Sequence, residues 1–188
     1  PNTYSGGTTI SAGTLSIGAD SGLGDTSGSL ALMSGTLQST GTFALNENRV
    51  VTLAGSSVMD VSTGQTFTIG QVIEDGVSTG SLTKSGAGTL TLSGPNTYSG
   101  GTSVSAGTLN IQNTLALGSA EATVSSGAQL QAQGGIAATN ALTLSGTGGG
   151  SGALLNISDS NTFSGAISLA ANTTIGSTAG LLTLGSGG

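Results

Sequence analysis

Side chains capable of chemistry are scarce in this sequence of 188 residues. It has no His and no Cys, and its only basic residues are Arg49 and Lys84. The abundant serines therefore lack the general base that usually activates them. Lys84 and Ser85 are adjacent, but neighbouring residues of a strand point to opposite faces. We predict that this pair does not form a nucleophilic site.

The carboxylates do not form an obvious catalytic pair either. A glycosidase needs two carboxyl groups that face each other across the substrate. The acidic residues in expected loops form scattered groups: Asp20 and Asp25, Glu47 beside Arg49, and Glu74 beside Asp75. We interpret these residues as solvated turn residues. An enzyme would require Asp60, Glu74, Asp75 or Lys84 to meet in one groove.

Three short motifs resemble binding or modification sites. Residues 20–25 look like an acidic calcium turn, but they lack the repeated nonapeptide of calcium-binding β-rolls, and a hard cation needs six or more oxygens. The glycines of 148–152 precede no predicted helix that could bind phosphate. Asn156 and Asn172 match the glycosylation pattern, which arises by chance in such a composition. We predict no catalytic, cofactor-binding or metal site.

The overall composition excludes several partners. The net charge of −6 leaves no basic patch for nucleic acid. No apolar run approaches the roughly 20 residues of a membrane-spanning helix, so we expect no membrane insertion of this segment. A chain rich in Gly, Ser and Thr can be disordered, but Leu, Ile and Val recur here in regular clusters, and charged residues are only 5%. We therefore expect a folded chain.

The dominant local pattern is apolar-x-apolar. Because successive side chains of a strand point to opposite faces, this pattern predicts short strands with one buried side. Such triplets occur at 30–32, 43–45, 51–53, 67–69, 90–92, 142–144, 155–157 and 182–184. No stretch has helical apolar spacing, and glycine is too frequent for helices to persist. We predict an all-β protein with essentially no helix.

Turn residues favour a parallel arrangement of these strands. Tight hairpins prefer Asn-Gly or Asp-Gly corners, yet the chain has no Asn-Gly and a single Asp-Gly at Asp75. Single glycines suit the open corners of a coil whose strands stack in parallel, each turn adding about 4.8 Å. We predict a right-handed parallel β-helix of roughly eight or nine turns, about 40 Å long, that forms one continuous segment over residues 1–188.

An internal repeat supports this solenoid. Residues 1–17 return as residues 95–111 with three differences, and a weaker copy begins at Asn161. The offsets of 94 and 65 residues correspond to about four and three turns of 20 to 25 residues. We expect the aromatic residues Tyr4, Tyr98 and Phe163 to enter the core at equivalent positions. We interpret the asparagines Asn2, Asn96 and Asn161 as making local side-chain to backbone bonds in turns.

These residues resemble the passenger-associated repeat of autotransporters. The fullest copy runs from Leu82-Thr83-Lys84-Ser85-Gly86-Ala87-Gly88-Thr89-Leu90 through Asn96-Thr97-Tyr98-Ser99-Gly100-Gly101-Thr102 to Leu109. The resemblance implies a type V secreted bacterial passenger with a right-handed β-helical stalk, displayed at the cell surface. It also implies export through a C-terminal outer-membrane barrel outside this fragment. It does not specify the activity, since fold does not fix function.

We predict a non-catalytic structural stalk and adhesion or self-association module. The expected partners are a second copy or extracellular surface and glycan ligands. Two alternatives are a polysaccharide-cleaving enzyme on the same fold and a passive spacer that carries a distal effector domain. The enzyme would need converging carboxylates and basic groups, which two basic residues barely supply.

Overall fold

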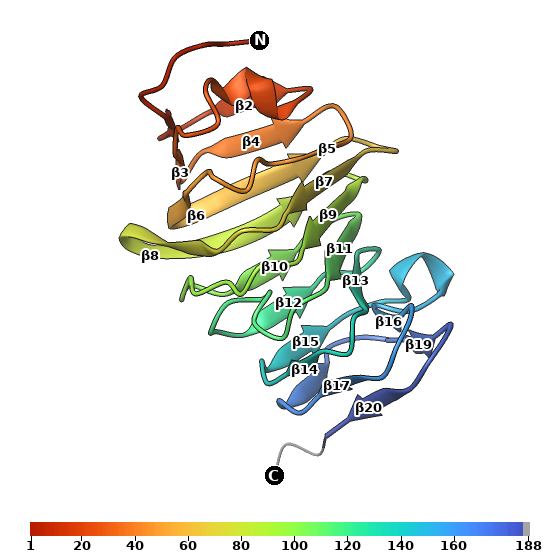
Figure 1. The fold of residues 1–188 in the computed structure, drawn as a ribbon. Helices are drawn as coiled ribbons and strands as arrows, with labels where there is room; N and C mark the ends of the chain where they lie inside the picture. Colours follow the sequence, from red (N-terminus) through yellow and green to blue (C-terminus); the bar gives the residue numbers. More distant parts are fainter. Residues whose placement is uncertain (186–188) are drawn as a thin grey trace.

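The protein is a parallel β-solenoid, as predicted. The structure, a computed structural model, describes residues 1–185, and in that range all strand pairs are parallel. Figure 1 shows the strands following one another in chain order from the N-terminal to the C-terminal end. No α-helix occurs among these residues, and two short 3₁₀ segments, η1 (Asp20–Leu23) and η2 (Gly148–Gly150), lie in connecting loops. No helix in the described range is long and apolar enough to cross a membrane.

The strands form three sheets. The ten-stranded first sheet contains β1 (Thr8–Ile10), β2 (Thr14–Ile17), β3 (Leu30–Met33), β4 (Thr36–Ser39), β6 (Val51–Val61), β8 (Ile73–Ser85), β10 (Thr102–Val104), β12 (Ala122–Val124), β15 (Leu142–Leu144) and β18 (Ile167–Leu169). The seven-stranded second sheet contains β5 (Phe43–Ala44), β7 (Thr66–Ile69), β9 (Thr89–Leu92), β11 (Thr108–Ile111), β13 (Gln129–Ala132), β16 (Leu154–Asn156) and β19 (Ile175–Ser177). The third sheet contains β14 (Ala137–Ala138), β17 (Asn161–Phe163) and β20 (Leu182–Leu184).

Two lines of pairing run through the first sheet, because the long strands β6 and β8 take part in both. The shorter line joins Thr8, Leu30, Val51 and Ile73. The longer line joins Thr14, Thr36, Val58, Thr83, Ser103, Thr123, Thr143 and Ser168. It crosses eight strands, one in each turn, so the described solenoid has eight turns. This agrees with the lower of the two predicted numbers.

The two repeat intervals have different meanings in the structure. The 65-residue interval equals three turns, as expected, because Thr102 reaches Ile167 in three pairing steps. The 94-residue interval spans about four turns, as expected, plus a further shift along the turn. Strand β10 of the second copy stacks below Thr14, not below Thr8. The second copy is therefore displaced by one further face of the solenoid, since β6 and β8 each cover two faces.

The core is a stack of aliphatic side chains, one layer per turn. One inward column of the longer line contains Leu15, Leu37, Met59, Lys84, Val104, Val124 and Leu144. All but the end residue Leu15 are buried. The predicted inward-outward alternation holds for most triplets, as in Leu142-Thr143-Leu144.

The alternation predicted for 155–157 is wrong by one residue. Leu154 pairs with the core residue Leu130, and Asn156 pairs with the core residue Ala132. Asn156 therefore points inward and is fully buried. Its amide group donates hydrogen bonds to the Asp159 and Ala179 carbonyls at the adjacent corner, which compensates for burying a polar side chain in place of an aliphatic one.

Candidate functional site

Lys84 lies in the core and not in a surface loop. It occupies the inward column between Met59 and Val104, and none of its surface is exposed. Its ammonium group donates to the carbonyls of Ser85 at 2.7 Å, Gly86 at 2.8 Å and Ala106 at 3.1 Å. The amine thus closes the corners of two successive turns.

The environment of Lys84 shifts the pKa of its amine. Burial lowers the pKa of Lys84 from 10.5 to about 8, and the nearby Asp60 carboxylate opposes that shift. The Ser85 hydroxyl, on the other face of the strand, donates to Asp60 at 2.8 Å. Lys84 and Ser85 therefore diverge, as expected from strand geometry, and Lys84 is a positioning group for backbone carbonyls.

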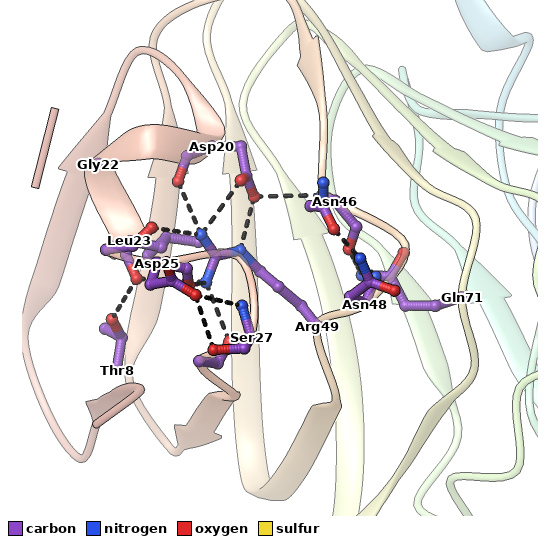
Figure 2. A network of polar contacts seen from close by, with 12 residues as sticks. Thr8, Asp20, Gly22, Leu23, Asp25, Ser27, Asn46, Asn48, Arg49 and Gln71 are labelled. Atoms are coloured by element: carbon purple, nitrogen blue, oxygen red, sulfur yellow. Dashed lines mark hydrogen bonds and ion pairs between the residues drawn. The ribbon is translucent and has the colours of Figure 1, made fainter. Parts of the chain in front are cut away.

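Arg49 is the second buried cation, and its guanidinium fills the loop that η1 begins (Figure 2). Its side chain has no exposed surface and forms an ion pair with Asp20 at 2.7 Å. It also donates hydrogen bonds to five carbonyl oxygens of the preceding turn, those of Asp20, Leu23, Gly24, Asp25 and Gly28. All seven hydrogen bonds of this guanidinium therefore connect two adjacent turns.

This arrangement corrects one sequence-based interpretation. Asp20 and Arg49 were expected to be solvated turn residues, but the guanidinium is buried and Asp20 pairs with it. The carbonyls of the loop that resembled a calcium turn accept hydrogen bonds from Arg49. Asp25 remains exposed, and bonds from Ser27 lower the pKa of its carboxyl group.

The carboxylates that an enzyme would need have separate partners. Asp60 accepts hydrogen bonds from Gln38 and Ser85. Asp75 accepts from the Gly80 amide and from Ser99, which lower the pKa of this carboxyl group. Glu74 and Glu47 are exposed beside a hollow of about 310 Å³. None of these contacts joins Asp60, Glu74, Asp75 and Lys84 in one groove.

The motif asparagines connect turns, so the interpretation as local turn bonds is wrong for Asn2 and Asn96. The buried Asn96 accepts from the Ile73 amide of the preceding turn and donates to the Ala116 carbonyl of the following one. Asn2 donates to Gly22, twenty residues away. Asn161 accepts from Ile136 of the preceding turn but also makes one local bond, to Ser158.

The aromatic residues of the motif occupy equivalent settings. Tyr98 and Phe163 are fully buried, and the Tyr98 hydroxyl forms a 2.6 Å hydrogen bond with Thr102. Tyr4 forms the same bond with Thr8 at 2.7 Å, but it is 43% exposed. Tyr98 and Phe163 therefore enter the core as expected, whereas Tyr4 does not.

The glycine-rich and glycosylation motifs also have structural explanations. The buried Gln129 amide donates to the Gly148 and Gly152 carbonyls, so the loop is packed against β13. Asn156 points into the core, as described above. Asn172 is exposed.

The outer surface carries no basic side chain, because both basic residues of the chain are buried. It carries instead rows of hydroxyl and amide side chains in register. One row on the longer line of the first sheet contains Thr83, Ser103, Thr123, Thr143 and Ser168. We call these five residues the hydroxyl row. A second row, on the second sheet, contains Thr68, Thr91, Asn110 and Gln131, of which Thr91 and Asn110 are buried.

Comparison with known proteins agrees with this architecture. The passenger-associated-transport-repeat model matches residues 1–17 and 82–111. The chain is also similar to the adhesin BmaC autotransporter of Brucella suis biovar 1 (strain 1330), with 40% identity over 91 residues. Those residues are 48% of this chain and span 2% of the relative's length. No solved structure matches the chain.

The fold and the repeat thus define the class: a parallel β-solenoid that carries passenger-associated transport repeats over residues 1–17 and 82–111. Within that class, the chain is similar to autotransporter passenger repeat proteins, as its motifs predicted. The expected location at the bacterial surface agrees with both comparisons.

Proposed function

We propose that this segment is a non-catalytic stalk that also adheres, either to a second copy or to an extracellular surface. The supporting observation is that the basic side chains are buried, whereas most hydroxyl and amide groups of the rows lie at the surface. Both cations are held by backbone carbonyls in the interior, whereas the outer faces present hydroxyl and amide groups in regular rows. A surface of that kind offers hydrogen bonds over a large area but no basic side chain to assist catalysis.

The adhesin relative supports the adhesive part of this proposal. Its printed name describes an adhesin, and the match covers about half of this chain. The rows of polar side chains repeat at the strand spacing of about 4.8 Å, so many weak contacts can add up along the rod. A passive spacer would need the rod but not the regular outer rows.

The test is surface display of residues 1–188 on a bacterium that neither clumps nor adheres to host cells. We expect clumping or adherence that the display carrier alone does not produce. A purified segment should correspondingly self-associate in sedimentation experiments or bind the same surface. A segment that stays monomeric at high concentration, and whose display causes neither clumping nor adherence, would identify a spacer instead.

A further inference from the structure

Two adjoining hollows mark one corner of the rod in turns four to seven. The first, of about 310 Å³, is lined by Thr83, Ser103 and Thr123 of the hydroxyl row. The second, of about 510 Å³, is lined by residues that include Asn96, Leu115 and Asn140. Both hollows share Ala120 and Glu121. We call the two together the Glu121 groove.

The groove lies where the turns of the solenoid are shortest. Leu82, Thr102, Ala122 and Leu142 succeed one another at intervals of only 20 residues, whereas Leu142 and the next member, Ile167, are 25 residues apart. The corner is correspondingly built from small residues that leave its floor low: Gly100, Gly101, Gly118, Ala120 and Ala141.

Four residues of β8 that have no partner in β6 border this region on its N-terminal side. Residues 76–79 of β8 have no strand partner, because the register passes from Asp75 directly to Gly80. Asp75 holds the base of this bulge through the Gly80 amide and the Ser99 hydroxyl. Ser81, just after the bulge, lines the first hollow.

The chemistry of the groove restricts the ligand. Glu121 is exposed and is the one ionisable side chain among the lining residues. One of its oxygens accepts a 2.5 Å hydrogen bond from Thr143, which orients the carboxylate. Since no lysine or arginine is exposed anywhere on the chain, nothing would balance an acidic ligand. The backbone of Thr83, Ser103 and Thr123 is already paired on both sides, so a peptide strand cannot add to it there.

We propose that the Glu121 groove binds an oligosaccharide without acidic groups, lying along the rod axis. Successive turns present one hydroxyl about every 4.8 Å, which is close to the length of one sugar unit in an extended β-linked chain. The hydroxyl row exchanges hydrogen bonds with the sugar hydroxyls, and Glu121 accepts from a hydroxyl or an amino group. This inference deepens the proposed adhesive function and rests on it.

Binding is tested by calorimetry and NMR titration of residues 1–188 with three β-1,4-linked tetramers: N-acetylglucosamine, glucosamine and glucuronic acid. We expect the first two to bind and the acidic tetramer to bind at least about tenfold more weakly, since like charges across a contact are costly. Glu121→Gln should weaken glucosamine binding more than N-acetylglucosamine binding. Failure of both non-acidic tetramers to bind, or equal binding of all three, would overturn the proposal.

A matched pair of variants locates the site. Thr123→Val removes one hydroxyl of the row while keeping a β-branched strand residue, and should weaken binding about three- to tenfold, the worth of one hydrogen bond. Thr162→Val makes the same change on the third sheet, outside both polar rows, and should leave affinity unchanged. Equal effects of the two variants would refute the location, and Ser103→Ala repeats the test if Thr123→Val perturbs folding.

Cell adhesion separates this inference from the proposed function. If displayed Thr123→Val and Glu121→Gln segments adhere as well as the parent, the groove is not the adhesive site although the stalk adheres. Loss of adherence in both variants, with Thr162→Val unaffected, would support the groove.

Discussion

Replacing Arg49 with alanine should open the N-terminal end of the rod. The change removes seven hydrogen bonds and the ion pair with Asp20, and it leaves five backbone carbonyls and a partly buried carboxylate without their donor. Removing one partner of a buried ion pair costs about 3–5 kcal/mol. We expect a loss of that size in the free energy of opening, confined to the first two turns because solenoid turns contact only their neighbours.

Native-state hydrogen exchange measures this effect locally. The Asp25 amide, bonded to the Tyr4 carbonyl, and the Leu30 amide, bonded to the Val50 carbonyl, report on the turns that Arg49 joins. Their exchange should accelerate by roughly two to four orders of magnitude, the equivalent of 3–5 kcal/mol, while the Ala122 amide of a distant turn should be unaffected.

Two variants serve as controls for Arg49→Ala. Arg49→Lys keeps the charge but loses the planar array of donors, so it should show an intermediate loss. Glu47→Ala changes an exposed neighbour and should alter stability by less than about 0.5 kcal/mol. If Arg49→Ala changes exchange near Asp25 no more than Glu47→Ala does, the guanidinium does not hold the loop and the reasoning is refuted.

Three further predictions follow from the corners and the core. Gly118→Ala should destabilise the protein by about 2–4 kcal/mol, because the Cβ of the new alanine would lie 2.5 Å from the Tyr98 carbonyl oxygen. Gly13→Ala, at the same φ of 71° but in open space, should cost only about 1–2 kcal/mol in urea unfolding. Burial lowers the pKa of Lys84 to about 8 in the folded protein, so the unfolded chain binds more protons than the folded one between pH 8 and 10. The urea concentration at the unfolding midpoint should therefore rise with pH over that interval. This rise should be smaller in Lys84→Met. Asn96→Ala should cost about 2–4 kcal/mol by leaving the Ile73 amide and the Ala116 carbonyl unpaired, and a thermal melt that matches the parent would contradict that role.

The sequence was sufficient for the fold because its signal is local and repeated. Alternating apolar residues such as Leu142 and Leu144 indicate which face is buried, and the missing hairpin residues favour parallel stacking. The phase of the first repeat was not predictable in the same way. It depends on how far β6 and β8 extend across a corner, and that length is set by pairing between turns.

The roles of the two cations were harder to predict, although partial signals existed. Lys84 follows Leu82 by two residues and therefore shares its buried face, a pattern that already indicates an inward amine. Arg49 comes two residues before the strand that begins at Val51. Asn140 stands at the same point before Leu142 and also donates to carbonyls of the preceding turn, those of Gly118 and Ala120. The loop that Arg49 enters is distant in sequence, so no local pattern identifies it.

The polar surface illustrates a different limit. Sequence alternation places Thr123 and Thr143 on the outer face, but their alignment with Ser103 depends on the register between turns. The groove beside Glu121 depends in turn on the short intervals between those strands. Both features become visible only when the turns are stacked.

The central claim is that the chain's basic residues hold the fold and are not offered to a substrate or partner. Labelling of primary amines at pH 8.5, followed by peptide mass spectrometry, tests it directly at Lys84. The amine is buried and bonded to three carbonyls, so Lys84 should stay unlabelled in the native protein and should react only after unfolding in urea. Labelling of Lys84 in the native protein at the rate of the unfolded chain would contradict the account.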